Sequence, residues 1–139
     1  MKVELVRTEG YGQTAEIEVD GQPLSVVDRV SQSNRPAESG LIEDAAFEVV
    51  ALEFRSWERA FEDNIASEKK LHHQWGWRYL GFGEIVGVEP DAVRIDLGLL
   101  TLSLRFEGAD PDWLGEYVAV PIERIVLSRQ SPGRDRGVV

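Results

Sequence analysis

His72 and His73 are the only histidines in the chain, so they are the first residues to consider for metal or proton chemistry. Zinc sites on a helix use imidazoles four positions apart so that both reach one ion, whereas adjacent residues on a strand point to opposite faces. No further set of ligands is visible near this pair, and the chain has no cysteine. The sequence favours two surface histidines, with a metal site at the pair as the weaker alternative.

Aromatic residues at alternate positions, Trp75, Trp77 and Tyr79, offer a second kind of chemistry. Alternation along one strand would place the three rings in a row, and barrels that bind oligonucleotides use such rows to stack bases. The charge disfavours this interpretation, because Arg78 is the only Lys or Arg between residues 74 and 93 and phosphates need several cations. The other interpretation is an aromatic edge of the core.

Signatures of catalysis are weak in this sequence. The glycines of residues 81–87 (GFGEIVG) superficially match a dinucleotide-binding pattern, but the spacing is wrong by one residue and a strand follows. Asp96 shares its face with Arg94, which predicts a solvated carboxylate, and only burial would make it a functional candidate. No carboxylate pair or serine triad stands out. We therefore lean toward a protein that is not an enzyme and needs no cofactor; a hydrolase or isomerase is the least favoured alternative.

The acidic residues are unevenly distributed. The formal net charge is −10, and residues 38–68 contain nine acids but only two bases, Arg55 and Arg59. Such a surface repels duplex nucleic acid and attracts a basic protein, although acidity also serves solubility. The candidate partner-binding residues are three acids of this stretch and four aromatic residues: Glu58, Glu62, Asp63, Trp75, Trp77, Tyr79 and Trp113.

Strands must position these side chains. Alternation predicts strands at about residues 2–8, 14–19 and 24–30, with Ala15, Ile17 and Val19 facing inward and Asp28 on the inner face of the third strand. Asp20-Gly21 is a strong two-residue hairpin signal. Residues 31–40 are polar, with Pro36 and Gly40, which predicts a loop.

Residues 45–65 are ambiguous. As one long helix they would share an apolar face that Glu53 interrupts, whereas residues 47–54 (FEVVALEF) also suit a strand buried on both sides. We favour a strand to about Phe54, followed by a helical or irregular stretch at 56–71, and keep the long helix as the alternative.

Residues 75–106 are predicted to form one long hairpin around the turn Glu89-Pro90-Asp91. The apolar alternation changes phase beside Gly98, which predicts a bulge in the returning strand. Residues 117–127 form the last strand or pair of strands, where Pro121 predicts an edge or a break. An unpaired edge there would permit a homodimer.

The sequence thus predicts a mainly β protein: a small antiparallel β-barrel of six to eight strands with one or two short helical segments. We expect a single domain over residues 1–130 and a tail at 131–139. Charges interrupt any signal peptide and the longest apolar stretch, residues 97–104, is too short to cross a bilayer, which favours the cytoplasm. The expected function is a non-enzymatic interaction module, such as an inhibitor or immunity protein that masks a basic partner. The alternative is a barrel that binds a small ligand or single-stranded nucleic acid through the aromatic row.

Overall fold

The computed structural model describes residues 2–53 and 56–130, most of which lie in strands. The chain packs as two compact units: unit 1 comprises Met1–Glu48 and Val126–Val139, and unit 2 comprises Val49–Ile125. The expectation of a single domain over residues 1–130 stays a prediction, and the expected tail at 131–139 lies outside the described residues. The elements in chain order are β1 (Val3–Thr8), β2 (Thr14–Val19), β3 (Gln22–Asp28), β4 (Gly40–Ile42), β5 (Ala45–Ala51), α1 (Trp57–Glu62), β6 (Lys70–Trp75), β7 (Arg78–Glu89), β8 (Ala92–Asp96), β9 (Thr101–Arg105), the 3-10 turn η1 (Pro111–Trp113) and β10 (Tyr117–Arg129).

In unit 1 the strands pair in the order β4-β1-β2-β3, and β3 then pairs with the last residues of β10. The inner positions of β2 are buried as the alternation predicts, and Asp20 and Gly21 both have positive φ in the β2–β3 turn. The β3–β10 pair is parallel, with Val27 opposite Val126. This parallel pair departs from the all-antiparallel arrangement expected from the sequence.

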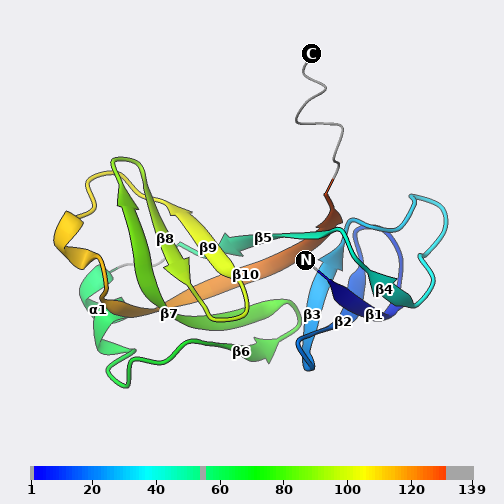
Figure 1. Ribbon diagram of the computed structural model, residues 1–139, viewed down its shortest axis with the longest axis horizontal. Helices are drawn as coiled ribbons and strands as arrows, with labels where there is room; N and C mark the ends of the chain where they lie inside the picture. Colours follow the sequence, from blue (N-terminus) through cyan, green and yellow to red (C-terminus); the bar gives the residue numbers. More distant parts are fainter. Residues whose placement is uncertain (1, 54–55, 131–139) are drawn as a thin grey trace, which may run out of the picture. The chain divides into compact units, whose positions relative to one another are not determined.

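In unit 2 the long strand β7 is the centre of the sheet. Its first half pairs with β6 on one side and with β10 on the other, and its second half pairs with β8. β7, β8 and β9 run side by side (Figure 1). The turn at Pro90 is confirmed, and the register shifts between Ile85 and Gly87, which places an irregularity of the β-bulge type in β7.

The part of the chain that the structure describes has ten strands, against the six to eight expected, and two of its turns were not predicted from the sequence. Gly98 has a φ of +90°, and the Leu97 N–H donates to the Leu100 carbonyl, so the chain reverses here into a separate strand, β9. The predicted bulge in one returning strand is therefore wrong. Gly76, with a φ of +55°, makes the second turn, between β6 and β7.

Pro121 lies inside β10 and not at an edge. It is opposite Leu80 of β7 on one side, and its carbonyl accepts a hydrogen bond from the Leu52 N–H on the other. A proline is tolerated there because the hydrogen bond to Leu52 uses its carbonyl group, which proline keeps, and not an N–H group, which proline lacks. The predicted edge is wrong, and with it the basis for the predicted homodimer at this position.

The strand β5 ends at Ala51 and the helix α1 begins at Trp57, so the split favoured from the sequence is confirmed and the single long helix is wrong. The end of the predicted strand, Phe54, lies outside the described residues. Ser56 has extended dihedral angles and its Oγ accepts a hydrogen bond from the Arg59 N–H at 3.2 Å, which starts α1.

The mainly β class is confirmed. A closed barrel is not, because β4 and β9 each pair with a single neighbour among the described strands. The core of unit 2 consists of aliphatic side chains on β7, β8, β9 and β10, such as Ile85, Ile95, Leu102 and Ile122. No helix among residues 2–53 and 56–130 combines the length and the apolar character needed to span a bilayer.

Candidate functional site in unit 2

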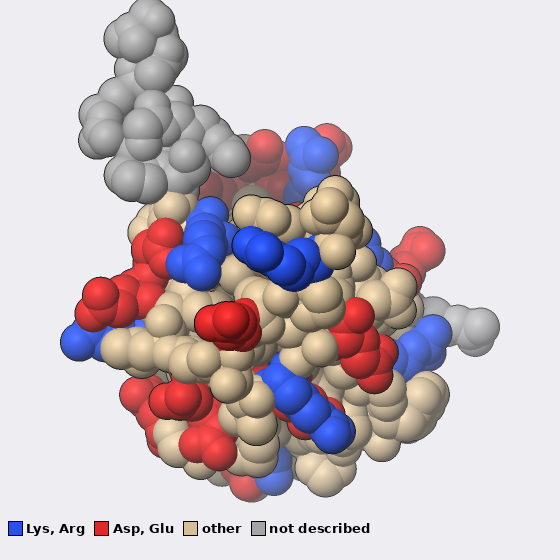
Figure 2. All heavy atoms as spheres, turned by 90° about the vertical axis from the view of Figure 1, so that its right-hand side faces the viewer, with Lys and Arg blue, Asp and Glu red and all other residues tan. Residues whose placement is uncertain are grey.

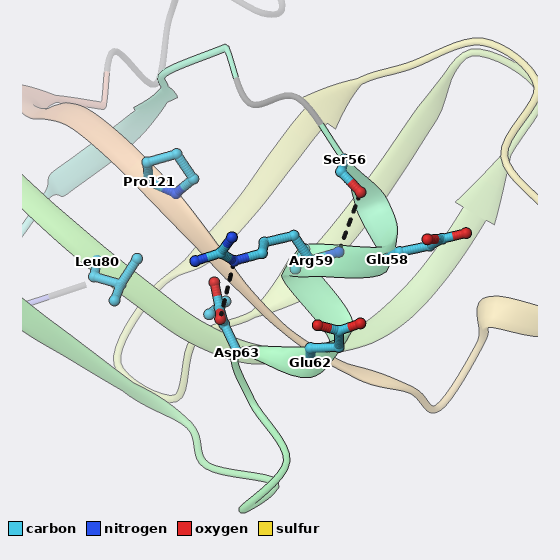
Figure 3. A pocket seen from close by; sticks show the side chains of 9 residues that line it. Ser56, Glu58, Arg59, Glu62, Asp63, Leu80 and Pro121 are labelled. Atoms are coloured by element: carbon cyan, nitrogen blue, oxygen red, sulfur yellow. Dashed lines mark hydrogen bonds and ion pairs between the residues drawn. The ribbon is translucent and has the colours of Figure 1, made fainter.

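A cavity of about 580 Å³ lies beside α1 in unit 2 (Figure 3). One wall is the exposed side of the helix, with Glu58, Arg59 and Glu62, and continues to Asp63 at the helix end. The opposite wall is apolar, with side chains from the paired strands β7 and β10. The cavity therefore combines a charged rim with an apolar floor.

Aromatic packing fixes the helix that carries the rim. The Trp57 ring lies 4.7 Å from the Trp113 ring and 5.3 Å from the Phe106 ring, measured between centroids, and Phe61 packs against Trp113 at 5.6 Å. Ala60 is buried on the same side of α1. Because Trp57 and Phe61 pack one face of the helix against Phe106 and Trp113, the charged residues of α1 lie on its exposed side.

The floor is held by strand pairing. Leu80 of β7 lies directly opposite Pro121 of β10, and Ala119 lies opposite Phe82. Pro121 is also hydrogen-bonded through its carbonyl to Leu52. A floor built on a doubly paired strand keeps its shape when a ligand arrives, which reduces the entropy lost on binding.

The rim carries an excess of negative charge. The rim has three carboxylates and one guanidinium, and Asp63 is the acid beside that guanidinium, with Arg59 Nε 3.7 Å from Asp63 Oδ1 in an exposed pair. No described cation lies within ion-pair distance of Glu58 or Glu62. These two glutamates are four positions apart on the helix, where like charges repel by a few tenths of a kcal/mol, roughly 0.2–0.5. A cation bound between them would relieve that repulsion.

The acidic run predicted as one surface is divided between the units. Of its nine acids, the four up to Glu48 belong to unit 1 and the five from Glu53 onward belong to unit 2. The face drawn in Figure 2 carries Lys and Arg interspersed with Asp and Glu, so its acids form no continuous patch. Of the predicted partner-binding acids, Glu58, Glu62 and Asp63 do come together, at the cavity.

The aromatic row does not form on one strand. Trp75 ends β6 and is 63% exposed, Trp77 lies half-buried in the turn, and Tyr79 is buried in β7. Trp113 is half-buried in η1, where it packs against Trp57 rather than lying exposed as expected. The alternative of a ligand-binding or nucleic-acid-binding barrel stays a prediction, but its expected row of rings is absent from these described residues.

His72 and His73 are both exposed on β6. The Nε2 atom of His73 lies 2.9 Å from the Gly76 carbonyl oxygen, and its ring packs 5.0 Å from the Tyr79 ring. In the part of the chain that the structure describes, no three His, Asp or Glu side chains are grouped so that they could hold a metal ion.

Asp96 belongs to a charge cluster that the sequence did not reveal. Lys69 Nζ lies 3.0 Å from Asp96 Oδ2 and 3.2 Å from Glu84 Oε1, and the Gly98 N–H donates to Asp96 Oδ1 at 2.8 Å. The hydrogen bond from the Gly98 N–H, followed by that from the Lys69 ammonium, holds the pKa of Asp96 below its ordinary value. The hydrogen bonds of Lys69 to Asp96 and then to Glu84 raise the pKa of Lys69. An ionised Asp96 that is paired with a lysine has a structural role in the sheet and is a poor proton donor.

Asp28 is the buried carboxylate of unit 1, as its inward position predicted. It accepts hydrogen bonds from the hydroxyls of Thr8 and Ser31 and from the N–H groups of Val30 and Ser31. Burial alone raises its pKa, but these donors outweigh burial and hold the pKa of Asp28 below its ordinary value. The saturated carboxylate anchors the loop that follows β3.

That loop also borders a hollow of about 820 Å³ in unit 1. Its charged lining is mixed, with Arg35, Glu38 and Arg129, and Arg129 is already paired with Asp44 at 3.0 Å. The unit 1 hollow therefore favours no single class of ligand, in contrast to the cavity beside α1.

No protein-family model matches the chain, and neither a curated protein nor a solved structure shows significant similarity to it.

Proposed function

We propose that this protein is a non-enzymatic interaction module, and that the cavity beside α1 binds a basic side chain of a partner protein. The observation that carries the proposal is the cavity's lining, which combines the carboxylates of Glu58, Glu62 and Asp63 with the apolar side chains of Leu80 and Pro121. In Figure 3 Asp63 is the carboxylate on the side of α1 nearer Leu80. An inhibitor or immunity protein that masks a basic partner is one form of such a module.

The lining matches the chemistry of lysine and arginine. Their side chains have an apolar stem and a charged head, so the stem can cover Leu80 and Pro121 while the head reaches the carboxylates. Buried anchors of this kind, surrounded by complementary charge, supply much of the affinity of protein interfaces. The net charge of −10 would also accelerate the approach of a basic protein.

The two carboxylates with shifted pKa values, both outside the cavity, are poorly suited to general-acid catalysis. Asp28 and Asp96 both have a pKa below the ordinary value, because hydrogen bonds stabilise their charged forms. A carboxyl group that acts as a general acid near neutral pH needs the opposite shift. The proposal does not depend on the expected cytoplasmic location or on a homodimer, which stay predictions.

The test is fluorescence anisotropy with the labelled peptide Gly-Ser-Arg-Leu-Arg-Ser-Gly and its counterpart with glutamate in place of arginine. The basic peptide should bind and the acidic one should not, and raising the salt from about 50 to about 300 mM should weaken binding. Replacing Glu62 by Gln and Asp63 by Asn should weaken binding roughly tenfold, because two partly screened contacts contribute about 1.4 kcal/mol together.

A matched double variant controls for net charge. Glu89→Gln with Asp91→Asn removes the same two charges from the exposed β7–β8 turn of unit 2. It should bind like the unaltered protein. Equal losses in the two double variants, or no binding of the basic peptide at millimolar concentration, would refute the proposal.

A further inference from the structure

We infer that the ligand of the cavity beside α1 is an arginine side chain of the partner. We also infer that Arg59 occupies this position in the free protein and competes with the partner's arginine for it. The inference rests on the proposed function and adds to it both the chemical class of the ligand and a means of regulating its binding.

The cavity already holds a guanidinium. In Figure 3 the Arg59 side chain runs along the cavity toward Leu80 and Pro121, and its charged end lies beside Asp63. The Nε atom is 3.7 Å from Asp63 Oδ1. The molecule itself thus places a guanidinium between the apolar floor and an acid of the rim, in the position that the proposed partner would use.

Arg59 is held loosely enough to be displaced. Its side chain is 78% exposed and its contact with Asp63 is near the limit of an ion pair. By contrast, Arg129 of unit 1 makes a 3.0 Å hydrogen bond to Asp44. Exposed pairs four positions apart on a helix change an equilibrium constant only about twofold, so a partner that contacts several groups would displace Arg59 readily.

Arginine suits this lining better than lysine. The planar guanidinium can donate two parallel hydrogen bonds to one carboxylate and can lie flat against an apolar surface such as the Pro121 ring. A lysine ammonium is compact and strongly hydrated, so it loses more water when it approaches Leu80. Asp63, which lies beside the Arg59 guanidinium, is the carboxylate that such a group reaches from the floor.

The rim charge explains why Arg59 should oppose binding. Three carboxylates and Arg59 leave the described rim at −2, and removal of Arg59 would leave it at −3 with Asp63 unpaired. The partner's arginine then meets both a stronger field and a free acceptor. We expect the affinity for an arginine peptide to rise roughly 3- to 10-fold.

The experiment compares Arg59→Gln with Arg94→Gln. Arg94 forms a similar exposed pair with Glu89, at 3.6 Å, on β7 and β8 of the same unit, so the two variants lose the same charge from comparable pairs. The probes are the labelled peptide Gly-Ser-Arg-Leu-Arg-Ser-Gly and its counterpart with lysine in place of arginine. Circular dichroism confirms that each variant is folded.

Arg59→Gln should bind the arginine peptide at least about threefold more tightly than Arg94→Gln, and every form should prefer arginine to lysine by a similar factor. Equal affinities of the two variants would overturn the role of Arg59 while leaving the proposed function in place. Equal affinities for the two peptides would overturn the choice of arginine. No binding by any form would overturn the inference and the proposed function together.

Discussion

Replacement of Asp28 tests whether one buried carboxylate holds the loop after β3. The Asp28 carboxylate accepts four hydrogen bonds, two from hydroxyls and two from backbone N–H groups. In Asp28→Asn the amide oxygen can keep the backbone donors, but the amide nitrogen faces the hydroxyls of Thr8 and Ser31. Those hydroxyls already accept from Gly10 and Ala37, so their own hydrogens lose an acceptor.

The expected losses of stability form a graded series. Asp28→Asn should lower the free energy of unfolding by about 1–2 kcal/mol, because two charge-assisted bonds are replaced by poorer ones. Asp28→Ala should lower it by about 3 kcal/mol, because the buried Ser31 N–H is also left without an acceptor. Asp20→Asn, at the exposed β2–β3 turn, is the control and should change stability by less than about 0.5 kcal/mol, since asparagine tolerates its positive φ.

The dependence on pH separates a charge effect from a packing effect. Because the pKa of Asp28 is lower in the folded protein, its ionisation stabilises the fold fully above the unfolded pKa, about 3.9. This contribution is lost as the pH falls through the lower folded value. The gap between the unaltered protein and Asp28→Asn should therefore be widest above about pH 5 and should shrink below pH 4.

Urea unfolding followed by circular dichroism gives the free energies, and hydrogen exchange of the Val30, Ser31 and Ala37 amides reports on the loop itself. Faster exchange at these amides in Asp28→Asn, with little change elsewhere in unit 1, is the expected local result. If Asp28→Asn matched Asp20→Asn in stability, or if the gap stayed constant from pH 7 to pH 3, the anchoring role of Asp28 would be refuted.

Three further substitutions test the sheet of unit 2. Gly83→Ala should lower the free energy of unfolding in urea by about 2–4 kcal/mol, because the added Cβ would collide with the Asp96 backbone. Gly87→Ala should lower it by under about 1 kcal/mol, since the nearest atoms are those at the flexible end of the Arg94 side chain. Equal losses in the two variants would contradict this reasoning. Lys69→Met should raise the pKa of Asp96 in an NMR titration but leave it below the ordinary value, because the Gly98 N–H still donates to the carboxylate; no change on removing Lys69 would show that the ion pair does not form.

Local sequence signals predicted the hairpin of unit 1 well. The Asp20-Gly21 turn and the alternation of β2 depend on neighbouring residues, so the sequence contains all of the relevant information. The same signals failed at Gly98, because a glycine beside a change of phase fits a bulge and a reversal equally well. Only the hydrogen bond from Leu97 to Leu100 distinguishes the two, and it depends on where β9 pairs.

The charge pattern predicted half of the candidate site. Glu58, Glu62 and Asp63 were singled out because acids are dense in that stretch, and they do line the cavity. The floor was missed, because Leu80 and Pro121 come together only through the pairing of β7 with β10. Pro121 predicts an edge or a break from its sequence alone, since a missing N–H does not reveal which neighbours the rest of the residue keeps.

The division of β10 between the units has a consequence for how the protein is made. Val126 pairs with Val27, so the sheet of unit 1 acquires its final partner only after all of unit 2 has been synthesised. Until then β3 presents an open row of backbone donors and acceptors, a state prone to association with other chains. Maturation of the amino-terminal strands should therefore be the slow step on a ribosome, and the one most helped by a chaperone.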